Sequence, residues 1–517
     1  MPAINNEVDE KGSSLTARAS WYLCAKVLAF AFSFALPLLL VRRLSQHEFG
    51  VYKQIFLVVG TAITTLPIGF GMSAFYFLPR ERERRGQIVF NILMFYSVMG
   101  GLACLALALY PTALAAIFND AEFLEYAPLV GLVIFLWAAS SFLEIVVIAN
   151  QEVKLATVLI VAAQFTKALI LLAAAVSFGS VKSLIYAAII QGALQAVILL
   201  SYLRARFGHF WRGFDWSVMR MQMAYALPFG FASLVLRANS ELHNYFVSYR
   251  FGAAEYAIYS IGCFNILLVD ILADSVGSVM IPRVSYLQSL DRRQEIIELM
   301  ARMMRKLAAV LFPVYVFLMI AGREFITTLF TERYLASWPI FAVNLTLVPL
   351  AILVSAYDPV MRAYAEHRYF LIKVRVVLIA ILFIALSFGT SRFGLLGAIS
   401  AVVGVSVIER FVTAFKSGII LGLTARDILL FRDVGRLAIA ATAAGAVAAI
   451  ARWPLLGSSP IIILAACGGL YFITYFTLVV AMGILTADER RSIRRRVTLV
   501  QRFAHWKRAA APVGEEV

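Results

Sequence analysis

Residues 88–110 read IVFNILMFYSVMGGLACLALALY, an apolar run without a single charged side chain. A helix of about 20 such residues crosses the roughly 30 Å hydrocarbon layer of a bilayer. Similar runs recur along the 517-residue chain, which is 62% apolar and only 15% charged. Soluble domains carry about 25% charged residues, and no stretch between the runs is long enough for one. The sequence therefore predicts an all-α integral membrane protein.

The apolar runs and the residues that interrupt them predict about 14 transmembrane helices. The predicted spans are 15–41, 52–78, 88–110, 126–149, 155–178, 183–203, 222–248, 256–281, 305–322, 338–361, 369–389, 394–416, 434–450 and 460–485.

The loops between these spans alternate in their content of Lys and Arg. Loop 79–87 carries four arginines, whereas loop 110–125 carries no basic residue. Short loops rich in Lys and Arg stay cytoplasmic, so both termini are expected inside. The formal net charge of +16 then indicates contact with anionic lipid head groups, not with nucleic acid.

Two loop sequences recur in the same order in the second half of the chain. Glu48-Phe49-Gly50-Val51-Tyr52 is echoed by Glu255-Tyr256-Ala257-Ile258-Tyr259, and Phe118-Asn119-Asp120 by Phe330-Thr331-Glu332. Six helices in each repeat would insert both halves the same way up. The echoes therefore predict two six-helix lobes related by a pseudo-twofold axis along the membrane normal, with two additional C-terminal helices.

The predicted organisation follows from these spans and loops. It comprises a cytoplasmic tail (1–14), an N-lobe (15–203), a basic and aromatic cytoplasmic linker (204–221), a C-lobe (222–416), a linker with two helices (417–485) and a basic amphipathic cytoplasmic tail (486–517). Apolar residues alternate with arginines at helical spacing in the last segment, which is typical of a helix lying on an anionic membrane surface.

The stretch from Val41 to Gly86 resembles the N-terminal signature of the polysaccharide (Wzx-type) flippases. These belong to the multidrug/oligosaccharidyl-lipid/polysaccharide exporter superfamily. The matching residues are Arg43-Leu44, Glu48-Phe49-Gly50-Val51-Tyr52, Pro67-Ile68-Gly69-Phe70-Gly71, the basic loop from Arg80 to Arg85, Ala226-Leu227-Pro228-Phe229-Gly230 and Phe330-Thr331-Glu332-Arg333-Tyr334. His243 stands where the family usually has an acidic residue, and Glu241 lies two positions earlier.

This resemblance implies a flippase that carries a polyprenyl-(di)phosphate-linked oligosaccharide across the bacterial inner membrane by alternating access. O-antigen, lipopolysaccharide or exopolysaccharide synthesis would be the setting, and polysaccharide polymerase machinery a further partner. Two alternatives stay open: a drug/cation antiporter of the same superfamily, and a membrane-embedded polymerase or glycosyltransferase. We expect no enzymatic activity, cofactor or metal, and a monomer driven by membrane potential or an ion gradient.

An ionisable side chain in hydrocarbon costs about 2.5–3.5 kcal/mol, so such residues face a cavity or a partner. The expected cavity cations for an anionic head group are Lys26, Lys167, Arg237 and Arg410, and the expected polar lining is Arg18, Tyr22, Gln164, Glu241 and Asn244. Structural ion pairing is the alternative, for example between Arg237 and Asp270 on neighbouring helices.

Ion coupling would need a carboxylate that changes its protonation or its bound cation. Asp270, Asp274 and Glu144 lie within predicted spans and are the candidates. Rocking lobes also need helices that bend, and Pro and Gly interrupt helices. The candidate hinges are Pro67, Gly69, Gly71, Pro228 and Gly230.

Overall fold

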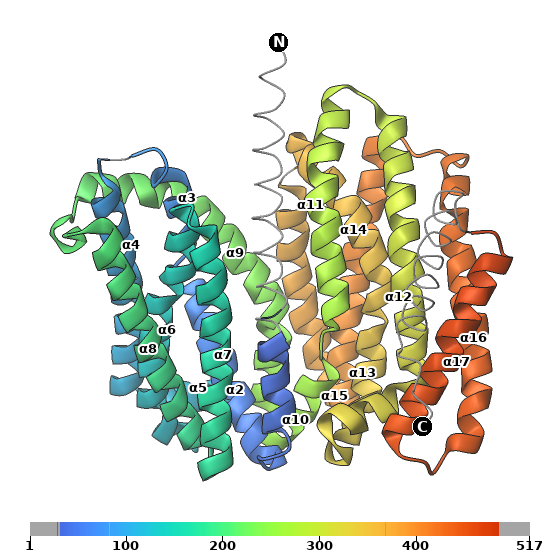
Figure 1. The fold of residues 1–517 in the computed structure, drawn as a ribbon, viewed down its shortest axis with the longest axis horizontal. Helices are drawn as coiled ribbons and strands as arrows, with labels where there is room; N and C mark the ends of the chain where they lie inside the picture. Colours follow the sequence, from blue (N-terminus) through green and yellow to red (C-terminus); the bar gives the residue numbers. More distant parts are fainter. Residues whose placement is uncertain (1–27, 29–30, 82, 368, 485–517) are drawn as a thin grey trace, which may run out of the picture. The chain divides into compact units, whose positions relative to one another are not determined.

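The computed structural model describes residue 28 and residues 31–81, 83–367 and 369–484. The described elements are helices joined by short connections (Figure 1). Arg18, Tyr22, Lys26 and both expected cytoplasmic tails lie outside the described residues.

The chain divides into two compact units. The first lies within Met1–Phe264, Ile326–Asn344 and Arg368–Glu409, and the second within Asn265–Phe325, Leu345–His367 and Arg410–Val517. The expected lobes at 15–203 and 222–416 remain a prediction.

The first unit holds a short apolar helix at Ala31–Leu40 and most of the helices that precede Phe264. These are α2 (Gln46–Thr65), α3 (Met72–Phe77), α4 (Arg85–Leu109), α5 (Thr112–Phe118), α6 (Phe123–Ala149), α7 (Val153–Phe178), α8 (Val181–Phe207), α9 (Trp216–Arg250) and α10 (Ala253–Gly262). It also takes nearly all of α13 (Trp338–Leu345) and the larger part of α15 (Phe370–Leu421).

The second unit holds the remaining helices. These are α11 (Leu267–Ser289), most of α12 (Arg293–Phe330), all of α14 (Leu347–Ala363), α16 (Arg432–Arg452), α17 (Pro460–Ala481) and the last turns of α15.

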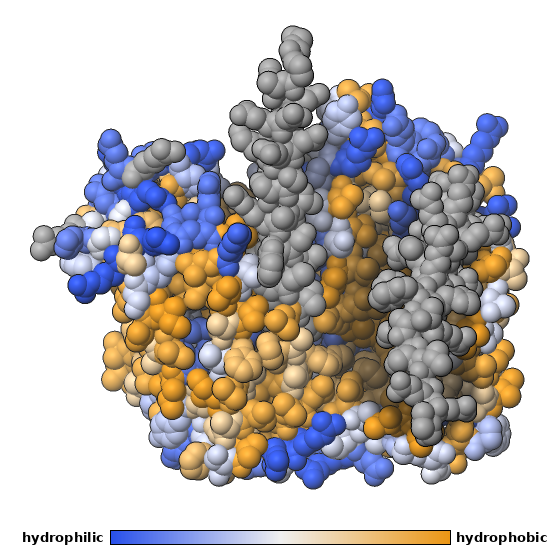
Figure 2. Space-filling model, viewed as in Figure 1, coloured by the Kyte–Doolittle hydropathy of each residue, from blue (hydrophilic) through white to orange (hydrophobic). Residues whose placement is uncertain are grey.

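Among the described residues, nine helical segments are long and apolar enough to span a bilayer, and α10 with α11 forms a further pair bent by 51°. Apolar side chains cover the middle of the helices, and hydrophilic ones gather near helix ends (Figure 2). The prediction of an all-α membrane protein is confirmed, and the count of 14 spans remains a prediction.

The 52-residue helix α15 is interrupted at Gly394, which has φ 57° and ψ −136°. The interruption falls at the first residue of the predicted span 394–416, directly after the predicted loop 390–393. A Cβ on Gly397 would lie 2.0 Å from the Gly389 carbonyl oxygen, so the backbones on the two sides of the turn touch. Phe370–Leu421 is therefore two helices joined by a tight turn.

The predicted linker 204–221 is shorter in the structure, because helices extend into it from both ends. Helix α8 continues to Phe207, and α9 already begins at Trp216. Asp215 caps α9 by accepting hydrogen bonds from the backbone N–H of Ser217 at 2.8 Å and of Val218 at 3.3 Å. Such N-capping explains why the helix starts before the apolar run does.

The first echoed motif begins α2 with a capping box. The Ser45 hydroxyl accepts from the Glu48 N–H at 3.2 Å, and the Glu48 carboxylate accepts from the Ser45 N–H at 2.8 Å. This reciprocal pair satisfies two helix-end donors. Phe49 is fully buried, with its ring centroid 5.9 Å from that of Tyr334.

Both copies of the second echo contain a residue with a positive φ. Asn119 has φ 52° and Thr331 has φ 74°, both positive. Positive φ is uncommon outside glycine, and for a β-branched residue it is an outlier. Their ψ values differ, at 40° for Asn119 and 162° for Thr331, so the two loops follow different paths and the repeat remains a prediction.

Candidate functional site

A cavity of about 300 Å³ lies inside the first unit, between α6, α7 and α8. Its lining comprises Ile63, Trp137, Ser140, Ser141, Leu143, Glu144, Leu159, Ile160, Ala163, Gln164, Lys167, Gln191 and Gln195. Three of the residues singled out in the sequence, Glu144, Gln164 and Lys167, meet here from two helices. The cavity is thus a polar site within apolar spans.

Lys167 contributes the positive charge of this cavity. Its Nζ lies 4.2 Å from the centre of the Trp137 ring, a cation–π contact. Within the described part of the chain, no carboxylate oxygen lies within 4.0 Å of Lys167. An ammonium group in contact with an aromatic face keeps its capacity to donate hydrogen bonds. The structure therefore presents an ammonium group to the cavity.

Trp137 forms a fixed wall of the cavity. Its indole Nε1–H donates to the Ala188 carbonyl at 2.9 Å. Its ring also packs on Gly192, where a Cβ would come within 2.6 Å of Cδ1. A glycine on α8 is thus required for the indole to reach this position.

Two glutamines of α8, neither of them predicted as a site residue, complete the lining. Gln191 is 2% exposed, and its Oε1 has no hydrogen-bond partner among the described residues. Gln195 accepts a long hydrogen bond of 3.5 Å from the Ser140 hydroxyl. Their spacing of four residues places them on one helical face, and this spacing is the signal that could have identified them.

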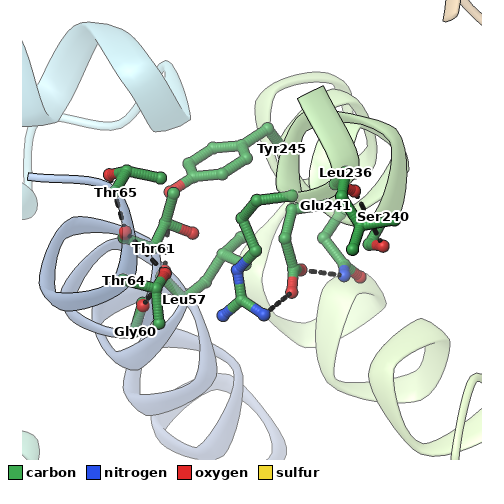
Figure 3. Close-up of polar contacts among 11 residues, drawn as sticks. Leu57, Gly60, Thr61, Thr64, Thr65, Leu236, Ser240, Glu241 and Tyr245 are labelled. Atoms are coloured by element: carbon green, nitrogen blue, oxygen red, sulfur yellow. Dashed lines mark hydrogen bonds and ion pairs between the residues drawn. The ribbon is translucent and has the colours of Figure 1, made fainter. Parts of the chain in front are cut away.

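A second polar cluster joins α9 to α2 (Figure 3). Arg237 Nη1 lies 3.4 Å from Glu241 Oε1, and Asn244 donates to the other Glu241 oxygen at 2.8 Å. Arg237 Nε is buried without a hydrogen-bond partner in the described structure. The three predicted polar residues of this helix therefore do come together.

The facing segment of α2 presents backbone and hydroxyl groups (Figure 3). Tyr245 reaches it and donates to the Leu57 carbonyl at 3.5 Å. Thr64 and Thr65 donate to carbonyls one turn earlier in their own helix, at 2.9 and 2.7 Å. A Cβ on Gly60 would lie 3.9 Å from Arg237 Nη2, so the glycine leaves space beside the guanidinium.

Arg237 pairs with Glu241 one turn away on its own helix, and its suggested pairing with Asp270, a residue of the second unit, remains a prediction. Neighbours at i and i+4 share a helix face, and this local partner was overlooked. Asp270 and Asp274 lie exposed on α11 in the second unit. His243, in the family's acidic position, bonds the Tyr259 hydroxyl at 2.9 Å.

Arg410 belongs to the second unit, where its Nη1 donates to the Leu347 carbonyl at 2.7 Å. The neighbouring Glu409 accepts from Arg375 Nε at 2.8 Å. Glu409 is thus engaged by a residue of the preceding helix.

The predicted hinge residues lie at an interruption of the second span. Between α2 and α3, Ile68 and Gly69 adopt φ values of 45° and 67°. A Cβ on Gly230 would lie 2.0 Å from the Ile68 carbonyl oxygen, so α9 packs directly on the interruption.

Two other hinge candidates have different surroundings. Gly71 faces the Tyr96 hydroxyl, 2.4 Å from where a Cβ would stand. Helix α9 runs through Pro228 without a break. Bending at all five positions remains a prediction.

Several solved structures share this fold. An inward-facing multidrug resistance MATE family transporter of the MOP superfamily aligns with a TM-score of 0.61 and 11% identity, covering 76% of this chain and 94% of its own. The lipid II flippase MurJ in an inward closed conformation aligns with a TM-score of 0.61 and 14% identity, covering 88% and 99%.

A third similar structure is a MOP superfamily transporter from Pyrococcus furiosus, described as having a binding pocket of reverse polarity. It aligns with a TM-score of 0.54 and 12% identity, covering 80% of this chain and 95% of its own. No protein of curated function shows significant sequence similarity to the chain.

The helical architecture places the chain in one class, the multi-pass membrane proteins with the fold of the MOP superfamily. The chain belongs to the family described as "Polysaccharide biosynthesis protein", whose family model matches residues 39–339. The resemblance to polysaccharide flippases is thereby confirmed.

Proposed function

We propose that the protein is a flippase that moves a polyprenyl-(di)phosphate-linked oligosaccharide from the cytoplasmic to the outer leaflet, for surface polysaccharide biosynthesis. The observation that carries this proposal is the polar cavity around Lys167 within otherwise apolar helices. A lipid-linked sugar has a head group that hydrocarbon rejects, and a flippase must supply polar contacts while the head group crosses. The lipid tail can remain in the bilayer.

The negative charge of the substrate's phosphate matches the cations in the cavity and in the α2–α9 cluster. Lys167 lines the cavity, and Arg237 lies in the α2–α9 cluster with one nitrogen unpartnered in the described structure. A fixed cation lowers the cost of moving a phosphate through a low-dielectric region. Lys26 is proposed to act in the same way, and so is Arg410.

The membrane potential is a sufficient driving force for such a substrate. An anion moving outward gains about 2.3 kcal/mol per charge for each 100 mV of inside-negative potential. Coupling to an ion gradient would use Asp270, Asp274 or Glu144. Alternating access would bend the chain at the candidate hinges around Gly69 and Gly230.

A drug/cation antiporter is the second candidate, because MATE transporters share the fold. A cationic drug would meet the ammonium of Lys167 in the same cavity, which disfavours it. The proposed setting is the bacterial cytoplasmic membrane, with both termini inside and anionic lipids at the basic loops.

Transport by purified protein in proteoliposomes tests the proposal. The assay follows a fluorescent polyprenyl diphosphate-linked oligosaccharide, with a cationic dye as the competing substrate. Wild-type protein should flip the lipid and leave the dye in place. Lys167→Glu should reduce flipping about tenfold or more, since it replaces the cavity's cation with a carboxylate.

Lys154→Glu is the matched control, because Lys154 is exposed in the first turn of the same helix, α7. It should transport like wild type. Dye transport without lipid flipping would overturn the proposal in favour of the antiporter. Unchanged flipping by Lys167→Glu would remove the cavity from the mechanism.

A further inference from the structure

We infer that the cavity between α6, α7 and α8 binds one uncharged sugar residue of the transported glycan. This inference rests on the proposed flippase function and adds the part of the substrate that the cavity recognises.

Amide groups around the cavity have hydrogen-bonding capacity that the protein leaves unused. Gln191 Oε1 is buried without a partner, and the Gln164 side chain bonds no other described residue. The amide nitrogen of Gln195 likewise donates to no described group. A buried unsatisfied polar atom costs about 1–3 kcal/mol. This cost applies to the buried Gln191 oxygen, and the half-exposed amides of Gln164 and Gln195 add bonding capacity around the same cavity. The lining therefore indicates a polar occupant.

The charged groups of the cavity also suit a sugar ring. Lys167 and Glu144 line the same cavity and carry opposite formal charges. A sugar hydroxyl accepts from an ammonium group and donates to a carboxylate, so a neutral ring can bond to both groups. The lining therefore suits hydroxyl and acetamido groups.

The side chains that line the cavity are chemically complementary to sugar hydroxyls. A carboxamide offers both donors and an acceptor, which matches a sugar hydroxyl that donates and accepts at once. The hydroxyls of Ser140 and Ser141 already donate within the protein, to the Trp137 and Ala138 carbonyls at 3.3 and 2.7 Å. Their lone pairs remain for ligand donors.

The size of the cavity also fits a single sugar residue. A cavity of about 300 Å³ is at the small end of ligand sites, which run from about 300 to 1,000 Å³. It has room for one sugar ring but not for an oligosaccharide or a polyprenyl chain. Trp137 acts as a wall and not as a stacking platform, because Lys167 covers its face.

Sugar binding is measured on the full-length protein in detergent by saturation-transfer NMR. The probes are methyl glucoside, N-acetylglucosamine, glucuronic acid and inorganic phosphate, the last followed by phosphorus line broadening. We expect binding of at least one neutral probe in preference to both anions. Gln191→Leu should weaken it about tenfold, as expected for losing a buried hydrogen bond.

Gln54→Leu is the matched control. Gln54 is 1% exposed and has an unpartnered Oε1 like Gln191, but it lies outside the cavity lining. The Gln54→Leu variant controls for the loss of a buried amide, and it should bind sugar like the wild-type protein. Circular dichroism and thermal unfolding confirm that both variants fold.

The flipping assay separates failure of this inference from failure of the proposed function. Wild-type flipping together with no neutral-sugar binding would show a cavity filled by water only, and would overturn the inference alone. Preferred binding of glucuronic acid or phosphate would overturn the neutral assignment. Absence of lipid flipping by wild type would instead overturn the proposed function.

Discussion

Gly50 and Ala253 touch through their backbones, since a Cβ at position 50 would lie 1.8 Å from the Ala253 carbonyl oxygen. Gly50 belongs to the first copy of the echoed motif, and Ala253 begins the helix that carries the second. The starts of α2 and α10 are thus packed against each other. The glycine of this motif serves packing, and the glutamate before it serves helix capping.

Gly50→Ala should therefore strongly reduce the amount of folded protein. The added methyl group would overlap a backbone oxygen that no rotamer change can move, and overpacking typically costs about 1–3 kcal/mol. Membrane abundance and the unfolding temperature in detergent measure the effect. Gly60→Ala is the control, because its Cβ meets nothing nearer than 3.9 Å. Equal stability of the two variants would contradict the observed contact.

The pairing of Arg237 with Glu241 predicts that single and double replacements differ. Glu241→Gln should lower stability by about 1–3 kcal/mol, because it leaves a partly buried guanidinium without its carboxylate. Replacing both residues by Leu should restore the unfolding temperature, since no charge is left unpaired. The same double variant should still fail to flip lipid. Normal flipping would show that Arg237 serves the fold only.

Thr331→Gly should stabilise the protein. Thr331 has φ 74° and ψ 162°, a region essentially restricted to glycine, and the strain of such a residue is about 1–3 kcal/mol. Glycine costs about 0.5–1 kcal/mol in chain entropy, so a net gain of about 1 kcal/mol is expected. Asn119→Gly is the control, because asparagine tolerates the left-handed conformation. The unfolding temperature should rise only in the Thr331 variant, and an equal response would argue against strain.

Gly230→Ala and Gly404→Ala should change stability in opposite directions. A Cβ at 230 would overlap the Ile68 carbonyl oxygen, whereas nothing lies within 4 Å of one at 404. Alanine is favoured over glycine in an unobstructed helix by about 0.5–1 kcal/mol. Thermal unfolding of both purified variants tests this expectation, and a stable Gly230→Ala would contradict the tight contact with the interruption after α2.

The helices were largely predictable because hydrocarbon demands long apolar runs. The span expected at 155–178 is α7 at Val153–Phe178, and the short span expected at 434–450 is α16 at Arg432–Arg452. The interruption at Pro67–Gly71 was predictable too, since Pro and Gly carry their own backbone preferences.

The polar contacts were harder to predict because they depend on how each helix is rotated about its axis. Apolar residues surround a membrane helix on all sides, so the hydrophobic pattern does not reveal its inward face. Gln191 and Gln195 were overlooked for this reason. The pair of Arg237 and Glu241 was not predicted, because depth in the bilayer was weighed above spacing along the helix.

Gly230 lies against the Ile68 carbonyl, so two segments of the same main chain touch without any intervening side chain. A contact made by a long side chain can absorb a displacement by changing rotamer, but a main-chain contact contains no such freedom. A shift of α9 at this point must therefore push the Ile68–Gly69 turn by nearly the same amount. A protein that changes conformation needs such rigid contacts, because they pass the movement of one helix directly to the next segment.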